Sequence, residues 1–354
     1  MNEKIAVLGA GAWGTAIGKV IAEKGNDVII WSYEKTTRDC INNDRENIQF
    51  LPDVKLPETL KATSDIEEAA EGKDFLIYAV PSLFLLDTLK KTLSVNSIRE
   101  GKTAIAVITK GFLPSEHGPR LIVETMEDYL PGFFRESLVY ISGPSHAEEV
   151  ARGKITGLIS ASENAKNSIR YRYLLKSPKL LVYSSLDIRG VQVAAAAKNV
   201  IAIAFGMLDA MKTGMTDMFG DGTDSLLLAA GLNEIQILGN ALGATHPETF
   251  TSISGIGDLD VTCRSIYGRN RRFGREIIEK NILASYKDID DLLKRIAEIG
   301  YLPEGIAAAK YIRLLAEKYK LKMPVAVGLC KILNKELDPM QFCKILLGDW
   351  DNKD

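Results

Sequence analysis

Short apolar runs alternate with stretches of helical periodicity over the first half of the chain. The runs that we predict to be strands cover residues 5–8, 28–31, 75–80, 103–108, 138–141 and 180–183. Most are separated by intervals with helical spacing, such as residues 13–24. Continuous apolar strands alternating with helices are typical of a mostly parallel sheet that helices cover on both faces. The pattern therefore predicts a doubly wound, mostly parallel α/β sheet.

The strand pattern stops after residues 184–188, and long helical patterns continue from there towards the C-terminus. We therefore expect two domains, a sheet domain over residues 1–188 and an all-helical domain over residues 189–354. The length of 354 residues and the hydrophobic content of 46% are sufficient for two hydrophobic cores.

Composition narrows the class of protein and its compartment. The net charge of -2 gives no indication of a nucleic-acid partner or an anionic membrane. The four cysteines lie far apart without a CxxC pair and only three histidines are present, so we expect reduced thiols and no metal site. No signal-peptide pattern opens the chain, which favours the cytoplasm. The apolar stretch 191–211 contains Gln192, Lys198, Asn199 and Asp209, which favours a buried helix over a membrane span.

A single amine, Lys198, interrupts the apolar run of residues 191–205. At helical spacing Ala194 and Ile201 share its face, so the ammonium must find a partner or lose its proton. A lysine in such a place suits proton transfer. The alternative is a lysine at the edge of a packed helix whose ammonium reaches solvent.

Residues 9–14, Gly-Ala-Gly-Ala-Trp-Gly, fit the GxGxxG pattern between a predicted strand and a predicted helix. Glycines allow the backbone to turn sharply and to approach a pyrophosphate, whose charge then lies at the helix N-terminus. This context predicts a Rossmann-like dinucleotide-binding domain for residues 1–188. The alternative is a glycine-rich turn without a ligand.

The second predicted strand ends at Trp31 and is followed by Ser32, Tyr33, Glu34 and Lys35. Glu34 could bind a ribose diol, and no arginine is present for a 2′-phosphate, so NAD is favoured as the cofactor. Lys35 keeps NADP open.

Residues 268–275 concentrate four arginines, whose paired donors match phosphate oxygens, and Asn270 adds neutral donors. A small phosphorylated substrate is the natural inference. The alternatives are a solvated basic face or an RNA contact, although no aromatic platform is interleaved. Asp258 lies in a glycine-bounded turn, where it could hold and orient the amine of Lys198 or cap the next helix.

Two further segments follow predicted strands, at the edge where open α/β sheets bind ligands. Lys110 follows the strand at 103–108 and is either a site residue or an ordinary surface lysine. Ser145 lies in the segment 142–147 and could line a nicotinamide or substrate pocket. His146 in the same segment is a candidate acid, but its position favours a capping turn.

With these motifs in order, the chain resembles the NAD-dependent glycerol-3-phosphate dehydrogenase family along nearly its whole length. The resemblance rests on residues 9–16, 51–52, 79–82, 110–111, 142–147, 149–151, 198–200, 257–259, 262–263, 269–270 and 304–305.

The resemblance implies interconversion of dihydroxyacetone phosphate and sn-glycerol 3-phosphate with NAD(P)H, supplying glycerol 3-phosphate for phospholipid synthesis in a cytoplasmic homodimer. The implied catalytic residues are Lys198, Lys110 and Asp258. The implied cofactor contacts are Gly9, Gly11, Ala12, Trp13, Gly14, Tyr33, Lys110, Ala147, Arg269, Leu302 and Glu304. The implied substrate contacts are Lys110, Gly143, Ser145, Lys198, Asp258, Gly268, Arg269 and Asn270.

Three positions depart from the family pattern. Gly268 replaces the serine that usually precedes Arg-Asn in bacterial members, Pro303 precedes Glu304, and Ala12 stands where serine or asparagine is common. Gly268 puts one hydroxyl contact to the substrate in doubt. Two alternative functions remain, a related two-domain reductase of another small phosphorylated or acidic ketone and a non-catalytic NADH sensor.

Overall fold

The computed structural model describes residues 3–214 and 218–346. The chain divides into two compact units. The first comprises residues 1–113 and 121–188, and the second comprises residues 114–120 and 189–354. The segment 114–120 thus belongs to the second unit, although it lies in the middle of the first along the sequence.

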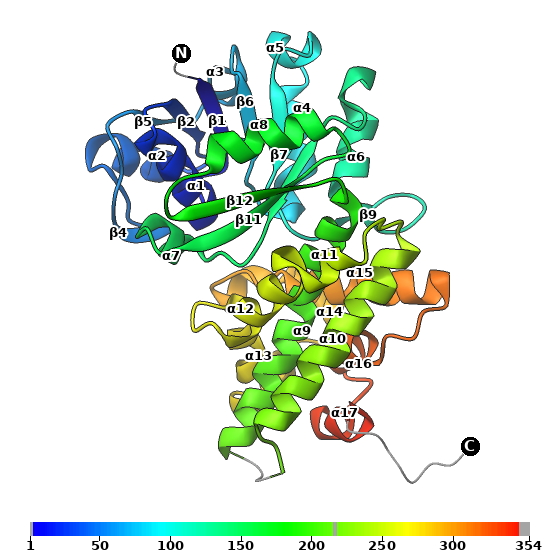
Figure 1. Ribbon diagram of the computed structural model, residues 1–354. Helices are drawn as coiled ribbons and strands as arrows, with labels where there is room; N and C mark the ends of the chain where they lie inside the picture. Colours follow the sequence, from blue (N-terminus) through cyan, green and yellow to red (C-terminus); the bar gives the residue numbers. More distant parts are fainter. Residues whose placement is uncertain (1–2, 215–217, 347–354) are drawn as a thin grey trace. The chain divides into compact units, whose positions relative to one another are not determined.

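The first unit alternates strands and helices (Figure 1). The strands are β1 (Lys4–Leu8), β2 (Asp27–Trp31), β3 (Glu46–Asn47), β4 (Leu51–Lys55), β5 (Leu60–Thr63), β6 (Phe75–Tyr78), β7 (Ala104–Val107), β8 (Phe112–Leu113), β9 (Arg120–Leu121), β10 (Val139–Ser142), β11 (Thr156–Ala161) and β12 (Leu180–Ser185). The helices are α1 (Ala12–Glu23), α2 (Lys35–Asn43), α3 (Ile66–Ala70), α4 (Ser82–Thr92), α5 (Asn96–Arg99), α6 (Ile122–Tyr129), η1 (Gly132–Phe134), α7 (Ala147–Ala151) and α8 (Ala165–Leu175).

Eight of these strands form one sheet in the order β12-β11-β10-β7-β6-β1-β2-β5. Every neighbouring pair is parallel except β10 and β11, which are antiparallel. The expected mostly parallel, doubly wound sheet is confirmed. Strands β5 and β11 were not predicted, because the sequences Leu-Lys-Ala-Thr and Thr-Gly-Leu-Ile-Ser-Ala lack a continuous apolar run.

Alternate residues of the strands pack on opposite layers of helices. Val7, Ile30 and Ile77 belong to a core that also contains buried residues of α1, α7 and α8. On the other face, the hydroxyl of buried Tyr78 forms a 2.6 Å hydrogen bond with Thr92 Oγ1 of α4. Burial of both faces explains why the central strands are apolar at consecutive positions.

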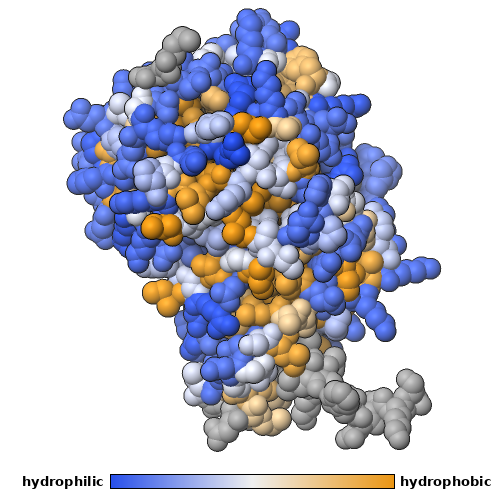
Figure 2. All heavy atoms as spheres, in the orientation of Figure 1, coloured by the Kyte–Doolittle hydropathy of each residue, from blue (hydrophilic) through white to orange (hydrophobic). Residues whose placement is uncertain are grey.

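The sheet ends at β12, where apolar side chains reach the surface. Leu181 and Tyr183 alternate with buried neighbours along β12 and are 41% and 52% exposed. Figure 2 shows apolar residues at the surface over β11 and β12. This edge therefore differs from the central strands, which are buried on both faces.

From residue 189 to residue 346 the described residues form helices and loops only, as expected. The elements are α9 (Ile188–Gly214), α10 (Asp221–Ala241), α11 (Glu248–Thr251), the π-helical segment η2 (Ile253–Gly257), α12 (Asp258–Arg264), α13 (Arg269–Glu279), η3 (Ile282–Ser285), α14 (Ile289–Lys294), η4 (Ile296–Ile299), α15 (Gly305–Tyr319), α16 (Pro324–Leu333) and α17 (Pro339–Leu346).

Helix α9 is the central helix of the second unit. A Cβ at Gly274 of α13 would lie 2.0 Å from Ile203 O, so the two helices touch backbone to backbone. A Cβ at Gly231 of α10 would lie 2.6 Å from the side chain of Ile201. One helix among the described residues, Ile188–Thr213, is long and apolar enough to cross a membrane, but its apolar window is entirely buried within the fold.

Candidate active site

The glycine turn between β1 and α1 has the geometry that a pyrophosphate requires. Gly9 has φ +129°, and a Cβ there would lie 2.8 Å from the backbone of Ala79. A Cβ at Gly14 would lie 2.1 Å from Gly9 O, so this glycine permits close packing of helix on turn. Gly11, by contrast, faces open space with no atom within 4 Å of a Cβ. Its backbone is therefore accessible to a ligand.

Helix α1 begins at Ala12, directly after this turn, and Trp13 follows in its first turn. The N-cap residue Gly11 has no side chain to accept hydrogen bonds from the first N–H groups. Those groups and the helix dipole are therefore available to an anion. The turn thus fits the pyrophosphate of a dinucleotide.

The end of β2 presents the residues expected beside the ribose. Tyr33 is 77% exposed, and Glu34 is the exposed N-cap residue of α2, with Lys35 next to it. Buried Ser32 fixes this turn by donating a 2.9 Å hydrogen bond to Glu34 O. The turn places both a carboxylate and an ammonium at the C-terminal end of β2.

The other expected residues of the first unit follow β7 and β10. These strands run parallel to β6, β1 and β2, so all five C-terminal ends lie at one edge of the sheet. Lys110 follows β7, whereas Gly143, Ser145 and Ala147 follow β10. Gly143 has φ +153°, and a Cβ there would lie 2.6 Å from Gly157 O. The backbone at this position therefore requires glycine. Ser145 Oγ donates to Gly143 O at 3.2 Å.

His146 is the N-cap residue of α7, in agreement with the capping turn predicted for this segment. Its side chain, however, makes no hydrogen bond to the N-terminal N–H groups of that helix. The cap is therefore a backbone feature only.

In the second unit, Lys198 of α9 and Asp258 at the start of α12 form a buried ion pair. Lys198 Nζ donates a hydrogen bond to Asp258 Oδ1, and the side chains are only 4% and 1% exposed. The structure thus excludes the reading of Lys198 as an exposed lysine. Burial of a charge is costly unless it is paired, and here each charge has an opposite partner.

The start of α12 positions Asp258. The π-helical segment η2 leads into α12, and Gly257, not Asp258, is its N-cap residue. The carboxylate therefore does not serve as the helix cap and is directed to Lys198. Within α12, Thr262 Oγ1 donates a 2.6 Å hydrogen bond to Asp258 O. This contact stabilises the turn that carries the carboxylate.

A second buried chain of contacts begins at the next residue of α9. Asn270 Nδ2 of α13 donates to Asn199 Oδ1 at 3.0 Å, and Gly305 N of α15 donates to Asn270 Oδ1 at 2.9 Å. A Cβ at Gly305 would lie 2.5 Å from Asn199 O, so α15 begins directly against α9. Asn270 therefore connects three helices beside Lys198, a structural task that the sequence did not indicate.

The arginines of the cluster at 268–275 differ in their partners. Arg271 and Arg275 both bind Asp209, and Arg275 also binds Glu279. Arg272 binds Glu276 at 3.1 Å. Arg269 is exposed and forms no ion pair within the described part of the chain. One guanidinium of the four thus remains available to an anionic ligand.

Arg269 is also the first residue of α13, whose N-cap residue is Gly268. Because glycine has no side chain to cap the helix, the first N–H groups of this 11-residue helix have no side-chain cap from the N-cap residue. A Cβ at Gly268 would lie 3.1 Å from both Thr262 O and Ser265 O, so this chain packs closely around the glycine.

Leu302 and Glu304 lie in the segment between η4 and α15, with Glu304 as the N-cap residue of α15. Glu304 is half-buried and its carboxylate makes no ion pair or hydrogen bond among the residues that the structure describes. Sequence reasoning missed the neighbouring Tyr301, whose hydroxyl donates to Glu276. The sequence signal for that contact was Glu276 itself, a glutamate on the core-facing side of α13.

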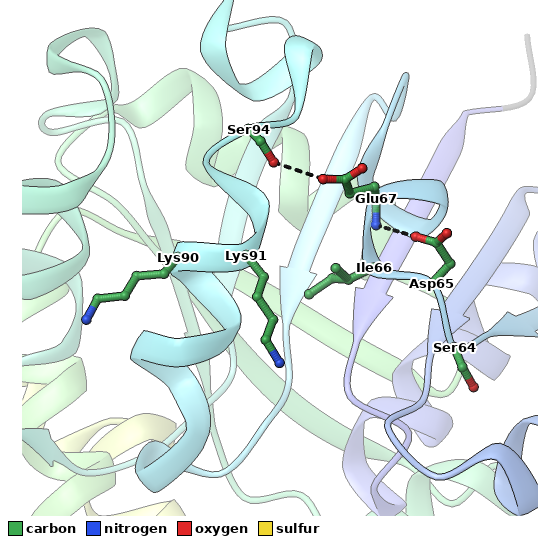
Figure 3. A pocket seen from close by; sticks show the side chains of 7 residues that line it. All are labelled: Ser64, Asp65, Ile66, Glu67, Lys90, Lys91 and Ser94. Carbon is green, nitrogen blue, oxygen red and sulfur yellow. Dashed lines mark hydrogen bonds between the residues drawn. The ribbon is translucent and has the colours of Figure 1, made fainter.

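A polar hollow lies between α3 and α4, and none of the expected site residues lines it (Figure 3). Ser94 Oγ donates to Glu67 Oε1 at 3.1 Å, and Glu67 N donates to Asp65 Oδ1 at 2.9 Å. Lys90 lies over the ring of Tyr129. Ser94, Glu67 and Asp65 thus bind one another, whereas Lys90 contacts a ring that does not line the hollow. Within residues 3–214 and 218–346, no group of His, Cys, Asp and Glu could hold a metal ion.

Comparisons with known proteins agree with this geometry. Residues 4–168 match the model of the NAD-dependent glycerol-3-phosphate dehydrogenase N-terminus, and residues 187–344 match that of its C-terminus. Glycerol-3-phosphate dehydrogenase [NAD(P)+] of Treponema denticola is 56% identical over 99% of both chains. The protein of the same description from Treponema pallidum strain Nichols is 50% identical over 97% of this chain and 99% of its own.

Among solved structures, glycerol-3-phosphate dehydrogenase from Coxiella burnetii is 32% identical with a TM-score of 0.82, covering 98% of this chain and 99% of that chain. A ketopantoate reductase from Ralstonia eutropha has a TM-score of 0.57 at 15% identity, which shows a shared fold alone. Both halves of the chain match the family models in order, and two relatives are 56% and 50% identical over nearly the whole chain. The chain therefore belongs to the NAD-dependent glycerol-3-phosphate dehydrogenase family.

Proposed function

We propose that the protein interconverts dihydroxyacetone phosphate and sn-glycerol 3-phosphate with a nicotinamide dinucleotide. The observation that carries the proposal is the buried pair of Lys198 and Asp258 in a chain of this family. An ammonium held within a core and oriented by a carboxylate can exchange one proton with a substrate oxygen.

Lys198 acts as the proton donor and acceptor in this proposal. In reduction it gives a proton to the oxygen of the developing alkoxide, and in oxidation it takes that proton back. Asp258 stabilises the ammonium form and fixes its direction, as the third member of a catalytic group orients a base. Lys110 is assigned to the same chemistry as a further cation that contacts substrate and cofactor.

The phosphate of the substrate is assigned to the N-terminus of α13. Arg269 supplies a guanidinium without an internal carboxylate partner, and the uncapped N–H groups that follow Gly268 supply neutral donors. Asn270 uses one Nδ2 hydrogen on Asn199 and has a second for a ligand. Gly143 and Ser145 are the substrate contacts assigned to the first unit.

The cofactor is assigned to the turn of Gly9, Gly11 and Gly14, where the open space at Gly11 supports a pyrophosphate. Bound NAD(P)H supplies the hydride for the ketone carbon. Glu34 favours NAD through the ribose diol. The remaining cofactor contacts are assigned to Ala12, Trp13, Tyr33, Lys110, Ala147, Arg269, Leu302 and Glu304.

At the level of the cell, we assign the enzyme to the cytoplasm as a homodimer that supplies glycerol 3-phosphate for phospholipid synthesis. Residues 1–188 are assigned as the dinucleotide-binding domain and residues 189–354 as the helical substrate-binding domain. No nucleic-acid partner is included, in keeping with the net charge of -2.

The test follows nicotinamide absorbance after purified protein is mixed with NADH or NADPH and dihydroxyacetone phosphate. Unphosphorylated dihydroxyacetone and ketopantoate serve as controls. Oxidation confined to the phosphorylated ketone supports the proposal and ranks the nucleotides. Oxidation with ketopantoate instead, or NADH binding without turnover of any ketone, contradicts it.

A further inference from the structure

The segment from Tyr301 to Gly305 is attached to helix α13 at both of its ends. At one end, the Tyr301 hydroxyl donates a hydrogen bond to Glu276 Oε2. At the other end, Gly305 N donates to Asn270 Oδ1 at 2.9 Å. Asn270 and Glu276 lie on the same helix, so α13 holds the segment at two points.

The Tyr301 end is built from charged groups. Arg272 lies over the Tyr301 ring, 4.3 Å from its centre, and also binds Glu276 at 3.1 Å. Lys280 binds the same Glu276 oxygen at 2.9 Å. Burial opposes the charge of Glu276, but the hydrogen bonds from Tyr301, Lys280 and Arg272 outweigh it and keep the pKa of this carboxyl below its usual value. The acceptor of the Tyr301 hydroxyl is thus a charged carboxylate, which makes a strong hydrogen bond.

The Gly305 end is fixed by packing as well. The side chain of a larger residue would collide with Asn199 O, which lies one residue after Lys198 on α9. Between the two attachments only Leu302, Pro303 and Glu304 remain, and the ring of buried Pro303 restricts its own φ. The three residues therefore have little conformational freedom.

We propose that Tyr301 and Glu276 are positioning residues for the nicotinamide dinucleotide, which they serve by holding Leu302 and Glu304 in a fixed arrangement beside α9. This inference rests on the proposed function, because it takes Leu302 and Glu304 as cofactor contacts. A segment ordered before binding loses little conformational entropy on binding, so loss of the Tyr301 contact weakens affinity for the nucleotide.

The decisive variant is Tyr301→Phe, which keeps the ring under Arg272 and removes only the hydroxyl. We expect the Kd for NADH, measured by fluorescence titration of the full-length protein, to rise about tenfold, as for loss of one hydrogen bond to a charged group. The KM for NADH should rise in parallel. The kcat at saturating NADH and the KM for dihydroxyacetone phosphate should stay within about twofold of wild type, because Lys198 and Arg269 are unchanged.

The matched control is Tyr286→Phe. Tyr286 is also stacked by an arginine, Arg295 at 4.8 Å, but lies before α14 and outside the segment 301–305. The Tyr286→Phe variant should leave the Kd for NADH unchanged. Glu276→Gln keeps an acceptor for Tyr301 and should weaken NADH binding less than Tyr301→Phe does. An equal rise in Kd with Tyr286→Phe, or a fall in kcat without a change in Kd, would overturn the proposal.

Glu304→Ala separates the positioning role of Tyr301 from the cofactor contact on which that role rests. If this variant weakens NADH binding and Tyr301→Phe does not, the cofactor contact stands and the positioning role is wrong. If Glu304→Ala has no effect, the contact assigned under the proposed function is wrong and the positioning role fails with it. If both weaken binding, Tyr301→Phe should cost less in the Glu304→Ala background than in wild type, because part of its effect passes through Glu304.

Discussion

Lys198 and Asp258 lie 60 positions apart in the sequence, yet in the folded protein the ammonium of one donates a hydrogen bond to the carboxylate of the other. Both side chains are at least nine-tenths buried, and they come from different helices, α9 and α12. The pair keeps a proton within the core and gives it a fixed direction. Substitution of either residue should therefore lower activity much more than substitution in other charged pairs of the same unit.

Replacement of Lys198 by alanine should lower kcat by about a hundred- to ten-thousandfold, the usual contribution of a positioned general acid. Lys212→Ala is the control, because Lys212 lies on the same helix and binds Asp224 at 2.9 Å. Initial rates with dihydroxyacetone phosphate and NADH measure both. Comparable losses in the two variants would show that α9, rather than the Lys198 amine, is what the reaction needs.

The same variant leaves the Asp258 carboxylate buried without the Lys198 charge, which should lower stability by about 3–5 kcal/mol. The double variant Lys198→Met/Asp258→Leu separates folding from catalysis, because it removes both charges and retains apolar volume. Thermal unfolding should return towards wild type, whereas activity should stay lost. Recovery of activity in the double variant would exclude the proton-transfer role.

Arg269→Ala should raise the KM for dihydroxyacetone phosphate by about ten- to a hundredfold, as expected for loss of a charge-assisted hydrogen bond to phosphate. Arg275→Ala is the matched control from the same helix, because its guanidinium is already bound to Asp209 and Glu279. Steady-state kinetics over a range of ketone concentrations would compare them. A larger rise in KM in Arg275→Ala than in Arg269→Ala would place the phosphate elsewhere on α13.

Local sequence patterns predicted the sheet and the helical half because buried strands and helices have apolar residues in continuous runs or at helical spacing. They did not predict β5 and β11, whose polar and small residues interrupt such runs. They also could not distinguish Arg269 from Arg271, because the difference is made by Asp209, 62 positions away from Arg271. The pairing of Tyr301 with Glu276 is likewise a tertiary contact. Local patterns therefore indicated candidate segments for the site, whereas long-range partners decide which of their side chains remain free for a ligand.

Replacement of Glu34 by serine should raise the kcat/KM for NADPH relative to NADH by several-fold. Glu34 lies at the C-terminal end of β2, where a carboxylate binds the ribose diol of NAD and repels a 2′-phosphate. Asp39→Ser removes an exposed carboxylate from the same helix α2 and serves as the control. Rates with both nucleotides at fixed dihydroxyacetone phosphate give the ratio. A ratio that responds equally to both changes would indicate a general effect of charge rather than a contact at the ribose.

The stability of the second unit should depend on the protonation of Glu234. This buried residue of α10 accepts hydrogen bonds from Val325 N and, at 2.9 Å, from Ala326 N, and so caps helix α16. Burial raises the pKa of Glu234 to about 7 from the ordinary 4.5, although the two backbone N–H groups oppose the shift. The folded state therefore binds this proton more tightly than the unfolded state does.

With the folded pKa above the unfolded pKa, the folded state holds more protons between pH 4.5 and 7, and stability falls as pH rises through that range. Below pH 4.5 both states are protonated and above pH 7 both are charged, so the contribution is flat outside the range. The slope can reach about 1.4 kcal/mol per pH unit within it. Glu234→Gln should remove this slope, as measured by urea unfolding at several pH values, whereas Glu248→Gln, at an exposed position, should retain it. If the wild type and Glu234→Gln show parallel curves, Glu234 is already charged throughout the range, and its hydrogen bonds to α16 outweigh the cost of burial.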